Sequence, residues 1–183
     1  MSLKTISEEY RALNKKLHED ENFGVLMNAD RSVAVIAEKA RIFHCQTMID
    51  YGCGRGYLKP ILAQKLPTLR VLEYDPAVEG KEICPQNADL VFCGDVLEHI
   101  EPHLLNNVLA HIKATKLKVV IAWVDHMPAI KTLADGRNAH ILQRPHHWWK
   151  KKLESVFSQV AVLSLALIDG DKNKIGKTLF MAR

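Results

Sequence analysis

The chain has 183 residues, with 48% hydrophobic and 25% charged side chains and a net charge of +4 at pH 7, values that are ordinary for one globular domain. No apolar run approaches the ~20 residues of a membrane-spanning helix, and the first residues lack the apolar core of a secretory signal, so we expect a cytoplasmic protein without a membrane partner. The four cysteines form no C-x-x-C pair and no zinc-binding spacing, which predicts reduced thiols.

Two helices are predicted ahead of the first strand, over residues 6–19 and 33–43, because apolar side chains recur there at helical spacing. Strands and helices alternate from residue 46 onwards. Strands are predicted over residues 46–50, 69–74, 90–93, 118–124, 160–168 and 177–182, and helices over residues 57–65, 102–112 and 148–157. Because near-continuous apolar strands that alternate with helices pair in parallel, this pattern predicts a parallel sheet covered by helices on both faces.

The last two predicted strands differ from the others. Residues 169–174 between them have the chemistry of a turn, which predicts an antiparallel hairpin that closes the sheet. Only twelve residues separate Pro76 from Asp89, so we expect a shortened region in which residues 78–84 form a rudimentary third strand or none. The expected fold class is α/β, a doubly wound, mostly parallel sheet with a C-terminal antiparallel hairpin strand. One domain is expected over residues 1–183, with residues 1–45 as a helical cap.

An acid and three alternate glycines follow the first predicted strand. Asp50 precedes Gly52, Gly54 and Gly56, and a helix is predicted to begin near Tyr57. Glycines lack a Cβ, so the chain can turn tightly and a ligand can approach the backbone beside the free N–H groups of the helix N-terminus. A dinucleotide-binding loop would need its third glycine at position 57, so this spacing indicates another cofactor.

The order Asp-x-Gly-x-Gly-x-Gly resembles motif I of the class I S-adenosylmethionine (SAM)-dependent methyltransferases. Residues 95–99, Asp-Val-Leu-Glu-His, resemble the superfamily's motif at the end of the fourth strand, which recurs in many small-molecule methyltransferases, and the chain as a whole resembles the small bacterial and phage type with type 11-like motifs. The resemblance implies a Rossmann-like fold, SAM as the cofactor and methyl transfer as the reaction. It also implies that the turn passes under the amino-acid part of SAM and that the acid before it serves the ammonium group. The cofactor contacts that it implies are Asp50, Gly52, Cys53, Gly54, Gly56, Asp75 and Asp95.

Two acids end the second predicted strand. In doubly wound sheets an acid about 20 residues after the glycine loop binds ribose hydroxyls. Asp75 lies 21 positions after Gly54 and Glu73 lies 19 positions after it, so spacing alone leaves both open. The Asp-Pro ending resembles the superfamily's acid-then-turn pattern and favours Asp75. The alternative is that Asp75 only caps the next turn.

His99 and Asp95 are the candidate catalytic residues. Both follow the carboxyl end of a predicted strand, where the ligand crevice of a parallel sheet lies. A histidine with a near-neutral pKa can take a proton from an attacking hydroxyl or amine, whereas the alternative role of His99 is that of a hydrogen-bonded structural group. His99 and His103 have helical spacing, but no third ligand follows, so no metal site is expected.

Residues 125–147 are predicted to form a long substrate or lid loop. Within it, His126, Arg137, Asn138 and His140 are the candidate substrate-binding residues, because they can bind a polar, even anionic, acceptor through charge-assisted hydrogen bonds. The run Asp-Gly-Arg-Asn-x-His, followed by Pro-x-x-Trp-Trp, resembles a loop in bacterial and phage members of the superfamily and names no substrate.

Aromatic residues outside these motifs have two predicted roles. Trp148 and Trp149 are expected to anchor a helix in the core rather than to stack on nucleic-acid bases. Tyr10, Phe23 and Gly24 are expected to fold over the cofactor, as the N-terminal segment of the superfamily often does.

The predicted function is transfer of a methyl group from SAM to an oxygen or nitrogen atom of a small polar acceptor. Such a displacement needs a positioned nucleophile, exclusion of water and removal of a proton. Two alternatives stay open. One is an RNA or nucleotide acceptor, which the mildly basic charge allows without favouring it, and the other is a SAM-binding partner subunit without turnover, which the short stretch of residues 76–88 suggests. The identity of the acceptor and the oligomeric state are left open.

Overall fold

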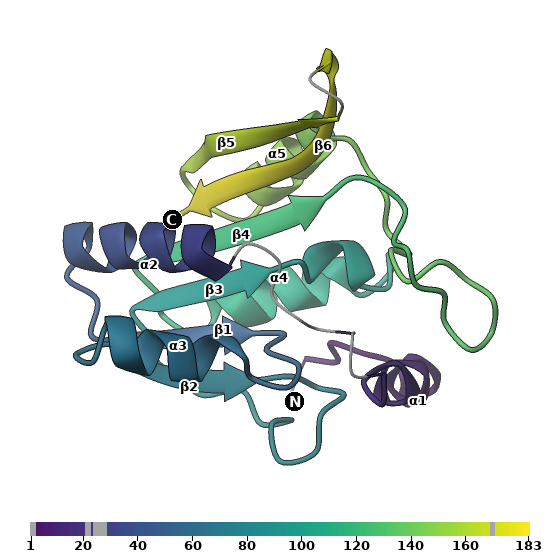
Figure 1. Ribbon diagram of the computed structural model, residues 1–183, viewed down its shortest axis with the longest axis horizontal. Coiled ribbons are helices and arrows are strands. Elements are labelled where there is room, and N and C mark those ends of the chain that lie inside the picture. Colours follow the sequence, from purple (N-terminus) through teal and green to yellow (C-terminus); the bar gives the residue numbers. More distant parts are fainter. Residues whose placement is uncertain (1–2, 21–22, 24–28, 169–170) are drawn as a thin grey trace.

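The computed structural model describes residues 3–20, 23, 29–168 and 171–183, which form one mixed sheet with helices on both faces (Figure 1). The strands lie in the order β2-β1-β3-β4-β6-β5. Their bounds are Thr47–Tyr51 for β1, Arg70–Tyr74 for β2, Leu90–Gly94 for β3, Val119–Asp125 for β4, Val160–Ile168 for β5 and Asp171–Ala182 for β6. The helices are α1 (Glu8–Leu17), α2 (Ala29–Ile42), α3 (Leu58–Lys65), α4 (Leu105–Lys113) and α5 (His146–Glu154), with a short 3₁₀-helix, η1 (Leu97–His99).

The pairing of the strands confirms the predicted fold class. Strands β2, β1, β3 and β4 pair in parallel, while β6 is antiparallel to both β4 and β5. One boundary was wrong: residues 171–174, predicted as part of the turn, belong to β6, and Asp171 pairs with Ile168. The ladder extends this far because backbone hydrogen bonds form whatever the side chains are. Residues 169 and 170 of the predicted turn lie outside the described residues.

The shortened region after β2 forms no strand, so β2 is an edge of the sheet. The segment curls back on the end of β2 instead. The Asp75 N–H donates to the Lys81 carbonyl at 2.9 Å, and the Val78 N–H donates to the Asp75 carbonyl at 3.3 Å. Of the two predicted alternatives for residues 78–84, the structure has the second, a turn without a third strand.

Helix boundaries differ from the predicted ones by up to four residues. The largest differences after the first strand are three residues: α5 ends at Glu154 rather than at Phe157, and α4 begins at Leu105 rather than at Pro102. Residues 101–104 stay in a turn closed by a 2.8 Å hydrogen bond from the Leu104 N–H to the Glu101 carbonyl. α2 begins at Ala29, four residues before its predicted start.

Two apolar layers hold the helices to the sheet. α2 and α3 cover one face, and α4 and α5 cover the other (Figure 1). Trp149 of α5 is completely buried in the second layer, and Trp148 is partly buried against it, which places both in the core as predicted. The described residues contain no helix that is long and apolar enough to cross a membrane.

α1 lies at the carboxyl ends of the parallel strands (Figure 1). Its Tyr10 hydroxyl donates to the His99 carbonyl at 2.7 Å, and the Ser7 N–H donates to Glu101 Oε2 at 2.8 Å. Tyr10 is 4% exposed, because Ala77 and further apolar side chains pack in the same small cluster. α1 therefore covers the edge of the sheet at which strand-end side chains gather.

Replacing Trp149 tests the packing of α5. Trp149→Ala is expected to lower the free energy of unfolding by about 3–5 kcal/mol, because the cavity left behind cannot refill. Trp149→Phe should cost less, since the indole Nε1–H has no hydrogen-bond partner among the described residues. The matched control is Trp148→Ala, which removes a side chain that is only partly buried. Urea unfolding measures all three, and equal losses for the two alanine variants would contradict this packing.

Candidate functional site

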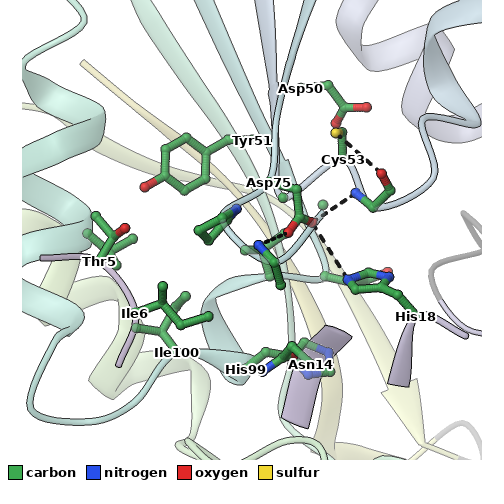
Figure 2. Close-up of a pocket in the computed structure, with 18 of the residues that line it drawn as sticks. Thr5, Ile6, Asn14, His18, Asp50, Tyr51, Cys53, Asp75, His99 and Ile100 are labelled. Atoms are coloured by element: carbon green, nitrogen blue, oxygen red, sulfur yellow. Dashed lines mark hydrogen bonds and ion pairs between the residues drawn. The ribbon is translucent and has the colours of Figure 1, made fainter. Parts of the chain in front are cut away.

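A cavity opens where β1, β2 and β3 end, beneath α1 (Figure 2). Three parts of the chain line it: the glycine loop, the strand ends and α1. The predicted cofactor residues Asp50, Gly52, Cys53, Gly54, Asp75 and Asp95 line this cavity, as does His99. The fold thus brings together most of the side chains that the sequence singled out at separate strand ends. Gly56 is not part of the lining.

The glycine loop depends on its glycines for backbone shape and for space. Gly52, Gly54 and Gly56 have φ angles of +77°, +51° and +87°, in the left-handed region that disfavours residues with a Cβ. A Cβ on Gly52 would lie 2.5 Å from Val96 Cγ2, and one on Gly56 would lie 1.9 Å from Glu73 Oε1. Gly56 therefore acts in the loop's packing rather than on the cavity surface.

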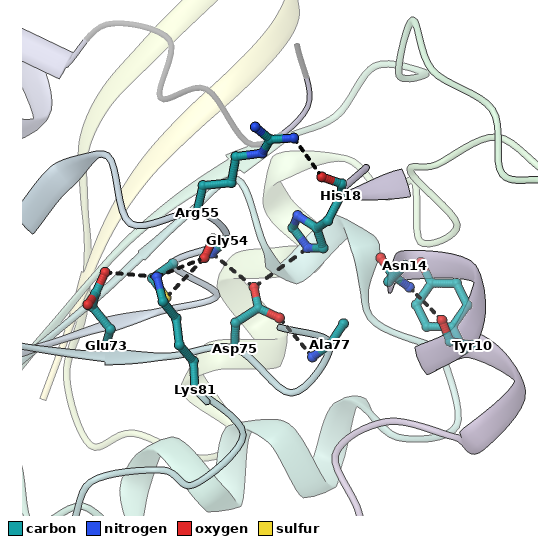
Figure 3. A network of polar contacts seen from close by, with 10 residues as sticks. Tyr10, Asn14, His18, Gly54, Arg55, Glu73, Asp75, Ala77 and Lys81 are labelled. Carbon is teal, nitrogen blue, oxygen red and sulfur yellow. Dashed lines mark hydrogen bonds and ion pairs between the residues drawn. The ribbon is translucent and has the colours of Figure 1, made fainter. Parts of the chain in front are cut away.

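Asp75 joins the glycine loop to the turn after β2 (Figure 3). Its Oδ2 accepts the Gly54 N–H at 3.0 Å, and its Oδ1 accepts the Ala77 N–H at 2.9 Å. His18 Nε2 of the segment after α1 lies 3.8 Å from the same Oδ2. A carboxylate oxygen accepts more than one hydrogen bond, so Asp75 holds the loop and still has capacity for a ligand.

Glu73, the other acid on this strand, does not line the cavity. It pairs with Lys81 at 3.0 Å and with Lys59 at 3.3 Å. Lys81 also donates to the Gly54 carbonyl at 3.1 Å, so the short segment after β2 braces the glycine loop (Figure 3). Geometry thus separates the two acids that spacing left equivalent: Asp75 faces the cavity, and Glu73 belongs to its support.

Asp50 is a buried carboxyl in unfavourable surroundings. It is 6% exposed, and no described group donates a hydrogen bond to it. Burial raises its pKa to about 7, and the nearby Glu73 carboxylate adds to the effect. A cationic group in the cavity would hold Asp50 in its charged form.

Cys53 is buried beside it, with its Sγ 3.6 Å from the Gly54 carbonyl oxygen. Burial raises the pKa of the Cys53 thiol to about 12, so the thiol stays protonated and does not act as a nucleophile.

Asp95 and His99 follow β3 with unusual local geometry. Asp95 has a φ of +57° and an ion pair with Lys177 of β6, and burial raises its pKa. His99 Nδ1 lies 2.9 Å from the Ala139 carbonyl oxygen. Burial, together with the neighbouring His140, lowers the pKa of His99 to about 3, so the ring is neutral.

The four predicted substrate residues do not line the cavity. His126 Nε2 lies 2.8 Å from a threonine hydroxyl of β6, and the pKa of His126 is lowered to about 4 by burial. Arg137 is exposed and pairs with the neighbouring Asp135. The Asn138 side chain forms hydrogen bonds with the backbone of its own loop. The His140 ring packs against His99, which lines the cavity, with ring centroids 4.7 Å apart.

α1 and the segment after it contribute two lining residues that the sequence analysis did not single out, Asn14 and His18 (Figure 2). Tyr10 and Phe23, which were expected to fold over the cofactor, also line the cavity. Gly24 lies outside the described residues. Tyr10, Asn14 and His18 are spaced four apart, so they share one helical face, and that spacing was the available signal.

The cavity is acidic. Asp50, Asp75, Asp95 and Glu101 line it, and its described lining contains no lysine or arginine. A low-dielectric cleft with one sign of charge attracts ligands of the opposite sign. Within the described part of the chain, no group of three His, Cys, Asp or Glu side chains could hold a metal ion.

Neither a protein-family model nor a curated protein matches the chain. Many solved structures do share its fold. An O-methyltransferase family protein from Burkholderia thailandensis is 16% identical, with a TM-score of 0.66 over 100% of this chain and 64% of that one. The 1,6-didemethyltoxoflavin-N1-methyltransferase of the same organism, with its substrate and S-adenosylhomocysteine bound, is 14% identical, with a TM-score of 0.62 over 98% and 91%. The small RNA methyltransferase HEN1 is 12% identical, with a TM-score of 0.65 over 84% of this chain and 25% of that one. The chain has the fold of the class I SAM-dependent methyltransferases.

Proposed function

We propose that the protein binds SAM in this cavity and transfers its methyl group to an oxygen or nitrogen atom of a small polar acceptor. The observation that carries the proposal is the meeting of the glycine loop with Asp50, Asp75 and Asp95 around one cavity whose described lining contains no lysine or arginine. SAM is a cation with an ammonium group and a positive sulfur. The buried Asp50, to which no described group donates a hydrogen bond, is the group that such a cation would satisfy.

Each group of lining residues has its own role in binding SAM and the acceptor. Asp50 would take the ammonium group, Asp75 the ribose hydroxyls, and the loop from Gly52 to Gly54 the amino-acid part of the cofactor. When bound, SAM supplies a methyl carbon activated by the positive sulfur. α1 covers the cavity and excludes water from it. The neutral ring of His99 has a nitrogen that can accept a proton from the acceptor.

The toxoflavin methyltransferase supports a small-molecule acceptor, because its similarity spans 98% of this chain and 91% of that one. The likeness to the small RNA methyltransferase HEN1 supports the alternative of an RNA or nucleotide acceptor. The acidic lining counts against phosphate groups deep in the cavity. Salt-sensitive retention on an immobilised RNA column would favour this alternative, while SAM binding without any turnover over a wide acceptor panel would favour a partner subunit.

Calorimetric titration with SAM tests the cofactor. Wild-type protein is expected to bind SAM with micromolar affinity, and Gly54→Val should abolish binding, because Gly54 lines the cavity at a φ of +51°. Gly136→Val is the matched control, since Gly136 also has a positive φ of +87° but has open space where a Cβ would lie. No binding by folded wild-type protein would contradict the proposal, and equal loss in both variants would remove its structural basis.

Asp50→Asn is expected to stabilise the free protein while weakening SAM binding. The pKa of Asp50 is raised from 3.8 to about 7, so the folded state is progressively penalised as pH rises from about 4 to 7 and carries the full cost above 7. One pKa unit corresponds to about 1.4 kcal/mol, so the gain in the variant should reach a few kcal/mol at pH 8 and vanish near pH 4.

Thermal unfolding at these two pH values, without ligand, measures the gain. The control is Asp30→Asn on α2, whose pKa is lowered by Lys65 at the surface, so its removal cannot stabilise the protein at pH 8. A wild-type protein that is no less stable than Asp50→Asn at pH 8 would show that Asp50 already has a partner.

A further inference from the structure

The loop between β4 and α5 contains a tight hairpin held by the Asn138 side chain. Asn138 Oδ1 accepts the N–H groups of Ala129 at 2.9 Å and His140 at 3.0 Å, and Asn138 Nδ2 donates to the Ala129 carbonyl at 2.8 Å. Backbone pairing between Thr132 and Asn138 closes the same turn. All three bonds of the amide serve the loop itself, so Asn138 is a clamp rather than a ligand contact.

The clamp fixes the residue between Asn138 and His140. Ala139 is completely buried, and its N–H donates to the Lys131 carbonyl at 3.0 Å. Its carbonyl oxygen is therefore held in one place, 2.9 Å from His99 Nδ1. A carbonyl only accepts hydrogen bonds, so Nδ1 must carry the proton.

The other ring nitrogen of His99 remains available. Since the neutral ring carries its proton on Nδ1, Nε2 bears a lone pair. Nε2 has no hydrogen-bond partner among the described residues. It is also not one of the fully buried polar atoms that lack a partner. His99 lines the cavity, so this lone pair is open to a ligand there.

We propose that Asn138 is a positioning residue that holds His99 in the Nδ1–H form, so that Nε2 receives the hydrogen of a neutral hydroxyl or ring N–H group of the methyl acceptor. The proposal rests on the proposed function and narrows its substrate class. It also gives a role to the Asp-Gly-Arg-Asn-x-His run, whose residues do not line the cavity.

The charge of the cavity disfavours a carboxylate acceptor. Such a group would face the Nε2 lone pair and the lining carboxyl of Glu101, while the nearest lysine, Lys177, is already paired with Asp95 and is not part of the described lining. An amine acceptor needs no proton-accepting group such as His99 Nε2, because its methylated product is an ammonium ion that keeps its proton. A methylated hydroxyl or ring N–H is a strong acid, so even a weakly basic imidazole can take its proton.

The methyl transfer needs only one group to take up the proton, His99 Nε2. The oxygen or nitrogen of the acceptor forms the new bond to the methyl carbon, while the carbon–sulfur bond breaks and its electron pair stays on sulfur. The proton of the acceptor passes to His99 Nε2 and then to water, which returns the ring to its neutral form.

Nitrogen-15 NMR of histidine-labelled protein tests the positioning without cofactor or turnover. Wild-type His99, assigned by its loss in His99→Gln, should show a protonated Nδ1 and a bare Nε2. Asn138→Ala should give a mixture of both tautomers. Ile130→Ala is the matched control, because Ile130 lies in the same loop with its side chain fully exposed, and it should leave the spectrum unchanged.

Asn138→Asp covers the case in which the alanine variant fails to fold, since Asp is similar in size but sets a carboxylate oxygen against the Ala129 carbonyl, which turns the donated bond into a repulsion and should also give mixed tautomers. A protonated Nε2 in the wild type, or unchanged tautomers in a folded Asn138→Asp or Asn138→Ala protein, would overturn the positioning role.

A panel of phenols, alcohols, N-heterocycles, amines and carboxylates, assayed with methyl-labelled SAM, tests the substrate class. Transfer to hydroxyls or ring nitrogens is expected, with kcat lowered roughly 100-fold in His99→Gln and roughly tenfold in Asn138→Ala, at similar KM. Transfer to amines or carboxylates would overturn the substrate class and leave the proposed function standing. Absence of SAM binding would overturn both, while the tautomer of His99 is read independently.

Discussion

The site depends on one buried carboxylate, that of Asp75. Its two oxygens accept backbone N–H groups from the glycine loop and from the turn after β2, at 3.0 and 2.9 Å. Both segments consist of irregular backbone, and this bridge joins them, together with the 3.1 Å hydrogen bond from Lys81 to the Gly54 carbonyl. A charged acceptor suits the task, since hydrogen bonds to charged groups are stronger than neutral ones and worth more in a dry site.

The segment after β2, which forms no third strand, supports the same loop as Asp75. The segment after β2 is too short to add a strand, and it curls back so that Lys81 reaches both the Gly54 carbonyl and Glu73. Glu73 in turn fills the space that a Cβ on Gly56 would need. The support of the loop is thus a compact ion-paired layer in place of a further strand, and the face toward the cavity is left to Asp75.

The cavity stores unfavourable interactions that a ligand would relieve. Among the described residues, none donates a hydrogen bond to the buried Asp50, and none bonds to Nε2 of the neutral His99. Each costs the free protein stability, because burial removes water without supplying a partner. A cation beside Asp50 and a hydrogen-bond donor beside His99 would satisfy both. Such destabilised groups are common at functional sites, and this cavity holds two of them.

The sequence by itself determined the strand-helix alternation, the glycine turn and the acids at the strand ends. These follow from local periodicity and from backbone rules that act within a few residues. Only the tertiary structure placed Asp75 rather than Glu73 on the cavity, brought Asn14 and His18 to the same cavity, and bonded the Asn138 side chain to the backbone of its own loop. These outcomes depend on contacts between distant residues, such as His99 with Ala139, 40 positions apart. Spacing in the chain carries no information about them, because side-chain direction and loop path are set by packing.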